Sequence, residues 1–150
     1  MPLAAPQELR TYFATAGTSN RRRLFQVEDR AALFIDVLLH YRRQGRFKLH
    51  AFVVMPDHFH ALLTPVPDVS LEKAVQFIKG GFSFRLRGKL DVWAKGFNES
   101  QIRTTEKFEA CKTYIETNPV RAGLASSAPE FPFSSFSRPE MVDVRPVHLR

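Results

Sequence analysis

The spacing of hydrophobic and polar positions along the chain predicts an alternation of strands and helices. Runs in which apolar and polar residues alternate are typical of half-buried strands, whereas apolar residues that recur every three or four positions favour amphipathic helices. In chain order, the pattern predicts a strand at 10–16, a helix at 29–43, strands at 46–55 and 59–64, a helix that begins after Ser70, a strand segment at 91–102 and a helix from 106 to about 117. Strands joined by a hairpin and by helical crossovers indicate an α+β fold, a ferredoxin-like sandwich with a mostly antiparallel sheet and helices packed on it.

Turn and capping residues indicate where several of these elements meet or begin. Pro56 and Asp57 lie between two strand-like runs, and this pair is typical of a turn, so the runs are expected to form a hairpin or a bent strand. Ser70 is expected to cap the helix that follows it, and Thr104 or Thr105 the last helix.

Other residues are expected to interrupt or end regular structure. Pro119 should end the last helix, because the residue before a proline is pushed away from helical angles. The pair Gly80-Gly81 weakens the helix that contains it and indicates close approach by another backbone or by a ligand. Residues 1–8 and about 137–150 are expected to be loose or peripheral to the domain.

Length and composition indicate one globular domain over residues 1–150. Hydrophobic residues make up 44% of the chain and include 14 phenylalanines, which suffices for a packed core without disulfides. The single cysteine, Cys111, excludes an internal disulfide and a cysteine-based zinc site, and it fits a reducing compartment. We see no signal peptide and no apolar run near the roughly 18 residues of a membrane helix, so a cytoplasmic protein is expected.

The net charge of +7 favours binding to polyanions, and nucleic acid above all. A basic surface that is merely solvated is the alternative. Basic and aromatic residues are interleaved between 73 and 95, a pattern that can hold a nucleic-acid backbone and stack bases. A helix with an aromatic core stripe and a solvated basic face would show the same pattern. The candidate DNA-binding residues are Lys79, Arg85, Arg87, Lys89, Trp93 and Arg121.

Two histidines form the first group of residues with chemical potential. His58 and His60 lie two positions apart in a strand-like run, so both side chains project from the same face of the strand. Two imidazoles so placed can bind one divalent metal. The alternative is that each histidine pairs with a carboxylate on the sheet surface.

Tyr114 and Asn118 form the second group. They are four residues apart on a predicted helix and therefore neighbours on one face. A tyrosine can act as a covalent nucleophile, and an asparagine oxygen is a suitable ligand for magnesium or manganese. Alternatively, the tyrosine packs its ring and exposes its hydroxyl to water, while the asparagine caps the helix.

Taken together, these motifs resemble the REP-associated tyrosine transposases, a group of the single-tyrosine HUH transposases of bacterial insertion sequences. The resemblance covers roughly residues 10–136, and the motifs agree in both order and spacing. The matching segments are 54–60 (VMPDHFH), 77–85 (FIKGGFSFR), 92–93 (VW) with 96–97 (GF), 114–124 (YIETNPVRAGL) and 131–135 (FPFSS).

The resemblance implies a ferredoxin-like sheet and an enzyme that cuts and rejoins single-stranded or hairpin DNA. It implies that His58 and His60 bind a divalent metal, Mg²⁺ or Mn²⁺, with Asn118 as the third protein ligand. It further implies that Tyr114 attacks the scissile phosphate and forms a 5′-phosphotyrosine. Asp57 departs from the family, which more often has asparagine there, and places a negative charge beside the expected metal.

Two other functions remain open from the sequence, as does the number of chains that act together. A non-catalytic nucleic-acid-binding protein on a ferredoxin-like scaffold would explain the charge and the aromatic residues. A metal-dependent phosphoesterase would use the histidines without a covalent intermediate. The protein acts either as a monomer or as a homodimer with exchanged tyrosine helices.

Overall fold

The computed structural model describes residues 9–88 and 91–150, and its elements follow the predicted order. The strands and α-helices are β1 (Thr11–Gly17), α1 (Glu28–Arg43), β2 (Phe47–Met55), β3 (His58–Pro65), α2 (Leu71–Leu86), β4 (Asn98–Ile102) and α3 (Thr105–Arg121). Short 3-10 helices are η1 (Ser19–Arg21), η2 (Leu24–Gln26), η3 (Ala128–Glu130) and η4 (Pro139–Met141). The strands form one sheet in the order β2-β3-β1-β4, and all neighbouring strands are antiparallel. Because β3 separates β1 from β2, this is the split arrangement of a ferredoxin-like fold, and the predicted fold class is confirmed.

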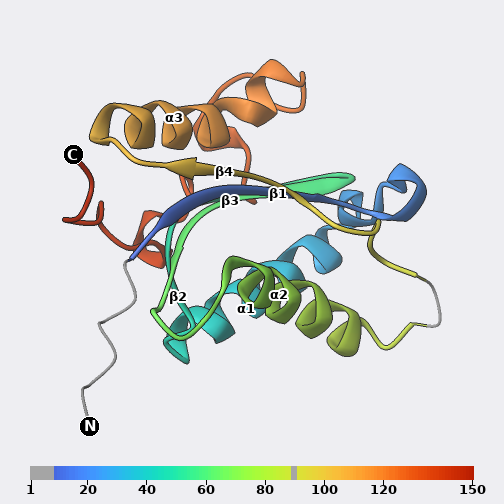
Figure 1. Ribbon diagram of the computed structural model, residues 1–150. Coiled ribbons are helices and arrows are strands. Elements are labelled where there is room, and N and C mark those ends of the chain that lie inside the picture. Colours follow the sequence, from blue (N-terminus) through green and yellow to red (C-terminus); the bar gives the residue numbers. More distant parts are fainter. Residues whose placement is uncertain (1–8, 89–90) are drawn as a thin grey trace, which may run out of the picture.

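Helices cover both faces of the sheet. Helices α1 and α2 lie on one face and α3 lies on the other (Figure 1). Side chains of β3 alternate between the two layers: Phe59, Ala61 and Leu63 join the core under α1 and α2, whereas Leu62 joins the smaller core under α3. His58 and His60 have the same parity as Leu62, so both belong to the face that α3 covers.

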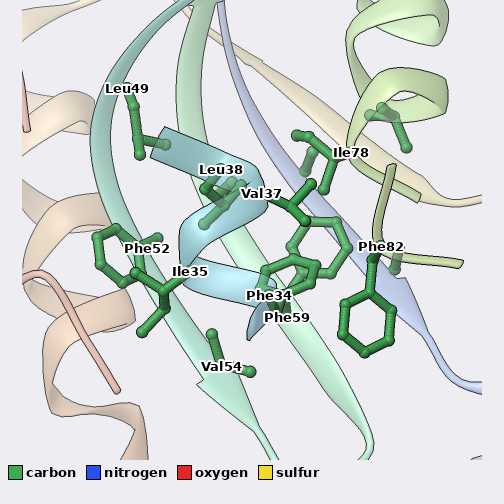
Figure 2. Close-up of a cluster of buried hydrophobic side chains, with 14 of the residues drawn as sticks. Phe34, Ile35, Val37, Leu38, Leu49, Phe52, Val54, Phe59, Ile78 and Phe82 are labelled. Atoms are coloured by element: carbon green, nitrogen blue, oxygen red, sulfur yellow. The ribbon is translucent and has the colours of Figure 1, made fainter. Parts of the chain in front are cut away.

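The larger core holds the strand that carries the histidines in place. Figure 2 shows aromatic and branched side chains from α1, α2 and the sheet packed against one another. Phe34, Phe59 and Phe82 are each at most 1% exposed. Since burying a phenylalanine side chain stabilises the fold by about 1.5–3 kcal/mol, β3 is firmly held from its far side.

Capping and turn predictions are confirmed. The Lys73 N–H donates to the Ser70 hydroxyl at the start of α2, and the Lys107 N–H donates to the Thr104 hydroxyl at the start of α3, both over 3.1 Å. Met55 pairs with His58 across the predicted turn between β2 and β3.

The strand predicted at 91–102 is shorter than expected. Only Asn98–Ile102 forms β4. Val92 is buried at 6% exposure, and Trp93 packs against the larger core. These apolar side chains face inward from a loop, and their hydrophobicity reflects this packing rather than a strand.

The prediction that Pro119 ends the last helix is wrong. Helix α3 continues through Pro119 to Arg121. A proline in a helix removes one backbone hydrogen bond, but the Ala122 N–H still donates to the Asn118 carbonyl over 3.0 Å. The helix stops at Gly123, whose φ of +75° is the left-handed conformation typical of a residue that follows a helix.

The glycine pair in α2 marks the close approach of a side chain, not of a backbone or a ligand. A Cβ atom on Gly81 would lie 2.7 Å from Cε2 of Tyr41 and 3.0 Å from Cγ1 of Val37. Both residues belong to α1, so Gly81 lets the two helices pack closely. A Cβ atom on Gly80 would meet nothing within 4 Å.

The C-terminal segment is peripheral, as one alternative held, but it is not loose. Asp143 receives two hydrogen bonds from the Arg42 guanidinium, over 3.0 and 3.1 Å, and a third from the Leu49 N–H. At the end of the chain, the Thr105 N–H donates to the Arg150 carbonyl over 2.7 Å. The expectation for residues 1–8 lies outside the described residues.

Within residues 9–88 and 91–150, no helix has both the length and the apolar run that crossing a bilayer requires.

Candidate functional site

The two histidines of β3 lie side by side beneath α3. Their ring centroids are 4.8 Å apart. His60 is buried at 7% exposure, while His58 is half-buried beside the turn. The predicted placement of both rings on one strand face is therefore confirmed, at the end of β3 that follows the Pro56-Asp57 turn.

Each ring uses its Nδ1 atom to contact the protein. Nδ1 of His58 lies 2.6 Å from Oδ1 of Asp57, and Nδ1 of His60 lies 2.7 Å from the Thr15 hydroxyl. In the described part of the chain, neither Nε2 atom takes part in a hydrogen bond. The contact with Asp57 matches the alternative in which histidines pair with carboxylates, but metal-binding histidines use the same arrangement, with one ring nitrogen on a protein partner and the other on the metal.

Burial keeps His60 in the form that binds metals. Desolvation, with smaller contributions from the charges of His58 and Arg121, lowers the pKa of His60 to about 4. Its imidazole is thus neutral at physiological pH. Burial acts to raise the pKa of Asp57, but the hydrogen bond and charge of His58 and the charge of Arg21 outweigh it, so that pKa is lowered.

Tyr114 lies next to the His60 ring of this pair. Its ring is edge-on to those of His60 and Phe13, with centroids 6.0 Å away in each case. The guanidinium of Arg121 lies over the Tyr114 ring, 4.2 Å from its centroid, and donates to the Tyr114 carbonyl over 2.6 Å. The other two tyrosines, Tyr12 and Tyr41, pack against the core on the opposite face of the sheet. Tyr114 is consequently the tyrosine that the fold brings to the histidines, and it is 47% exposed.

One hollow of about 650 Å³ gathers the predicted residues. His58, His60, Tyr114 and Asn118 all line it, although they come from β3 and α3. The four-residue spacing of Tyr114 and Asn118 places both on the face of α3 that meets the sheet. The structure therefore brings the two predicted groups into one site.

The chemistry of the site fits a divalent metal only if an amide contributes. The described residues contain no group of three or more histidine, cysteine, aspartate or glutamate side chains suited to holding a metal ion. Two neighbouring imidazoles with Nδ1 already bonded, together with the Asn118 amide in the same hollow, form an acceptable donor set.

Sequence reasoning missed several residues of the hollow. Thr15, Arg21, Lys95 and Asn98 also line it. Arg21 was visible as a signal in the run of arginines from 21 to 23, and Lys95 in the basic stretch that ends at 95. Thr15 reaches the site because it pairs with His60 across β1 and β3, a register that sequence patterns do not specify.

Two of the residues predicted to contact DNA make hydrogen bonds within the protein. The Lys79 ammonium donates to the carbonyls of Ala94 and Gly96, each over 3.0 Å, and burial lowers its pKa. The Trp93 indole N–H donates to the Lys79 carbonyl over 2.9 Å, and its ring packs among core phenylalanines. Lys79 thereby holds the loop at 94–97, part of the wall of the hollow, and the DNA contacts of Lys79 and Trp93 stay predictions.

The remaining candidates differ in their placement. Arg85 and Arg87 are exposed at the end of α2, where Arg87 has a left-handed φ of 55°. Arg121 is exposed and contacts Tyr114. Lys89 lies outside the described residues.

The chain is similar to known transposases in both sequence and fold. Residues 9–118 match the family model described as Transposase IS200 like. The chain is 30% identical over 129 residues to a REP-associated tyrosine transposase of Escherichia coli, which covers 85% of this chain and 77% of that protein.

Solved structures agree with this similarity. A REP-associated tyrosine transposase bound to a REP hairpin has a TM-score of 0.77 at 27% identity, covering 94% of this chain and 85% of that one. A protein of Deinococcus radiodurans shares the fold, with a TM-score of 0.53 at 21% identity over 77% of this chain and 96% of that one. The resemblance that the sequence motifs indicated is confirmed, and the chain belongs to the family of IS200-like transposases.

Proposed function

We propose that this protein cuts and rejoins single-stranded DNA, folded as a hairpin, with Tyr114 as the nucleophile. His58, His60 and Asn118 are the proposed ligands of a divalent metal, Mg²⁺ or Mn²⁺. The observation that carries the proposal is the contact between the rings of Tyr114 and His60 in a hollow that Asn118 also lines. Hairpin DNA is proposed because a similar transposase was solved with a REP hairpin.

The ligand assignment rests on the neutral state of His60 and on the Nδ1 contacts of both imidazoles. When bound, the metal would polarise the scissile phosphate and stabilise charge on the leaving oxygen. The depressed pKa of His60, about 4, keeps its ring available to a metal throughout the physiological range.

The reaction conserves phosphoester bonds. The Tyr114 oxygen forms a bond to phosphorus while the bond between phosphorus and the 3′ oxygen breaks. The phenolic proton passes to solvent, and the 3′ oxygen leaves as a hydroxyl after taking up a proton. Attack by a 3′-hydroxyl on the 5′-phosphotyrosine then restores the DNA backbone and the tyrosine, so no nucleotide hydrolysis is needed.

Basic side chains around the hollow are suited to hold the strand. Arg21 and Lys95 line it and are exposed. Their charges can neutralise phosphates on either side of the scissile bond, which fixes the register of the DNA without reading its sequence. Positioning matters because the nucleophile must come within roughly 3–3.5 Å of phosphorus.

A labelled hairpin tests the proposal. Single-stranded DNA with a REP-type hairpin and single-stranded flanks is incubated with the protein and Mn²⁺, with the label at the 3′ end. The proposal predicts a protein-linked, 3′-labelled strand on a denaturing gel, and none with Tyr114→Phe. That variant removes one oxygen and should still bind the hairpin.

Other outcomes would contradict the proposal in distinct ways. Cleavage without an adduct would indicate a phosphoesterase, and binding without cleavage would indicate a DNA-binding module. An adduct that mass spectrometry maps to Tyr12 or Tyr41 would reject the nucleophile.

A further inference from the structure

We propose that Asp57 is a positioning residue for His58. Its carboxylate holds the imidazole in the tautomer that carries the proton on Nδ1, so that Nε2 is left bare for a divalent metal, and Arg21 fixes the carboxylate. The role toward the metal rests on the proposed function, whereas the tautomer is a property of the metal-free protein.

Both carboxylate oxygens of Asp57 are engaged. Oδ1 lies 2.6 Å from Nδ1 of His58, and Oδ2 lies 3.1 Å from Nε of Arg21. An ionised carboxylate only accepts hydrogen bonds, so the nitrogen that faces it must carry a proton. In a neutral imidazole the other nitrogen, Nε2, then keeps its lone pair.

The second histidine has a partner of different chemistry. Nδ1 of His60 faces the hydroxyl of Thr15, and a hydroxyl both donates and accepts. That contact orients the ring without dictating its tautomer. The proposal therefore predicts a fixed tautomer for His58 specifically.

Asp57 is itself held in place by its backbone. Its carbonyl accepts hydrogen bonds from the N–H and the hydroxyl of Thr18, over 2.9 and 3.1 Å. The neighbouring Pro56 carbonyl accepts from the Phe25 N–H over 3.0 Å. The turn is thus hydrogen-bonded to the segment that follows β1, and this fixes the backbone that carries the Asp57 side chain.

The same segment has an unusual backbone conformation at Arg21 and at the residue before it. Asn20 and Arg21 have φ angles of 55° and 54°, a left-handed conformation that costs free energy for residues other than glycine and persists where the surroundings impose it. The Arg21 side chain is 71% exposed, so its ion pair adds little stability. Within the protein, the consequence of this ion pair is the orientation of the Asp57 carboxylate.

The tautomer is measured first, without metal. ¹⁵N-histidine-labelled protein in EDTA at pH 8 is examined by long-range ¹H–¹⁵N correlation, and His58 is assigned from the spectrum of His58→Ala. We expect the Nδ1–H tautomer in the parent and a loss of that preference in Asp57→Ala. An Nε2–H tautomer in the parent, or an unchanged Nδ1–H tautomer in Asp57→Ala, would overturn the proposal.

Metal affinity is measured next, by titration with Mn²⁺ alone. Loss of a residue that orients a ligand typically weakens metal binding about 10–100-fold, and we expect this for Asp57→Ala. Asp57→Asn should lose less, because its amide oxygen can still accept the bond from Nδ1. Arg21→Ala should weaken Mn²⁺ binding, whereas Arg23→Ala removes the same charge from the same segment and should not.

The outcomes separate this inference from the proposed function. A parent protein with the Nδ1–H tautomer and the expected Mn²⁺ series, but without a DNA adduct, would keep Asp57 as a positioning residue and reject the cleavage reaction. If the parent forms the adduct but Asp57→Ala binds Mn²⁺ as tightly as the parent, the reaction is kept and the role of Asp57 is rejected.

Discussion

The ring of Tyr114 meets the ring of His60 edge-on, with centroids 6.0 Å apart, within a single chain. Tyr114 reaches this position from α3, which packs directly on the strands β2 and β3 of its own sheet. The proposed nucleophile and the proposed metal ligands therefore meet without an exchange of helices between subunits.

This relationship predicts the outcome of a mixing experiment. Tyr114→Phe lacks the nucleophile and His58→Ala lacks a proposed metal ligand, so neither should form a DNA adduct alone. Because each chain assembles its own site, an equimolar mixture should also remain inactive on the labelled hairpin. Adduct formation by the mixture at a substantial fraction of the parent level would instead show that helices are exchanged in a dimer.

The glycine pair of α2 offers matched variants with opposite effects on stability. Gly80→Ala adds a methyl group that meets nothing within 4 Å and should stabilise the protein by about 0.5–1 kcal/mol, because alanine favours the helix and loses less entropy. Gly81→Ala places a Cβ atom 2.7 Å from the Tyr41 ring and should destabilise it by about 1–3 kcal/mol. Urea unfolding measures both, and equal effects would refute the close contact between α1 and α2.

Lys79 and Arg85 should respond differently although both are basic residues of α2. Lys79→Ala removes two hydrogen bonds to the 94–97 loop and should lower the free energy of unfolding by about 1–3 kcal/mol. Arg85 is exposed, so Arg85→Ala should change stability by less than about 0.5 kcal/mol.

Salt titrations of single-stranded DNA binding complete this comparison. If Arg85 contacts a phosphate, its removal should make the slope of log K against log salt shallower by about 0.7. The slope for Lys79→Ala should match that of the parent. A shallower slope for Lys79→Ala with unchanged stability would instead support Lys79 as a DNA contact.

Two buried imidazoles predict a loss of stability in mild acid. Burial lowers the pKa of both His50 and His60 below the usual histidine value of about 6.5, that of His60 to about 4. As the pH falls below about 6.5, these two histidines take up protons in the unfolded chain but not in the folded one. Their contribution to stability, which is fully present above that pH, is therefore lost progressively. The lowered pKa of His60 should cost up to roughly 2 kcal/mol between pH 7 and pH 5.

Unfolding in urea with EDTA at pH 7, 6 and 5 checks this expectation. His60→Asn should be less stable than the parent at pH 7 but should lose less stability on acidification. Identical pH profiles of the parent and His60→Asn would exclude His60 as a source of the pH dependence.

Local patterns were sufficient to predict the fold and the two halves of the site. The alternation along β3 determines that His58 and His60 share a face, and the helical spacing of Tyr114 and Asn118 does the same on α3. What patterns could not provide is the packing of α3 over β3, which brings these halves together. That contact depends on the apolar face of α3, and the family resemblance, not the spacing, predicted it.

Some contacts and one helix end could not be predicted, because tertiary contacts override local preference. Trp93 was predicted to stack on bases, and the sequence did not indicate that its partly buried ring also packs against core phenylalanines. Lys79 was predicted to contact phosphate, and the sequence did not indicate that its ammonium also donates to two carbonyls of the 94–97 loop. Pro119 disfavours a helix locally, but it lies so near the end of α3 that only one hydrogen bond is lost and the packing of α3 outweighs that loss.

The segment around Ser134 lies antiparallel along the outer edge of β2. The Val54 N–H donates to the Phe133 carbonyl, and the Ser135 N–H donates to the Phe52 carbonyl, both over 2.9 Å. An uncovered edge strand offers unpaired backbone groups to any other chain and invites aggregation. Because this segment covers the edge of the most apolar strand of the sheet, we expect it to protect the protein from aggregation. A chain shortened before residue 131 should precipitate at concentrations that the full chain tolerates.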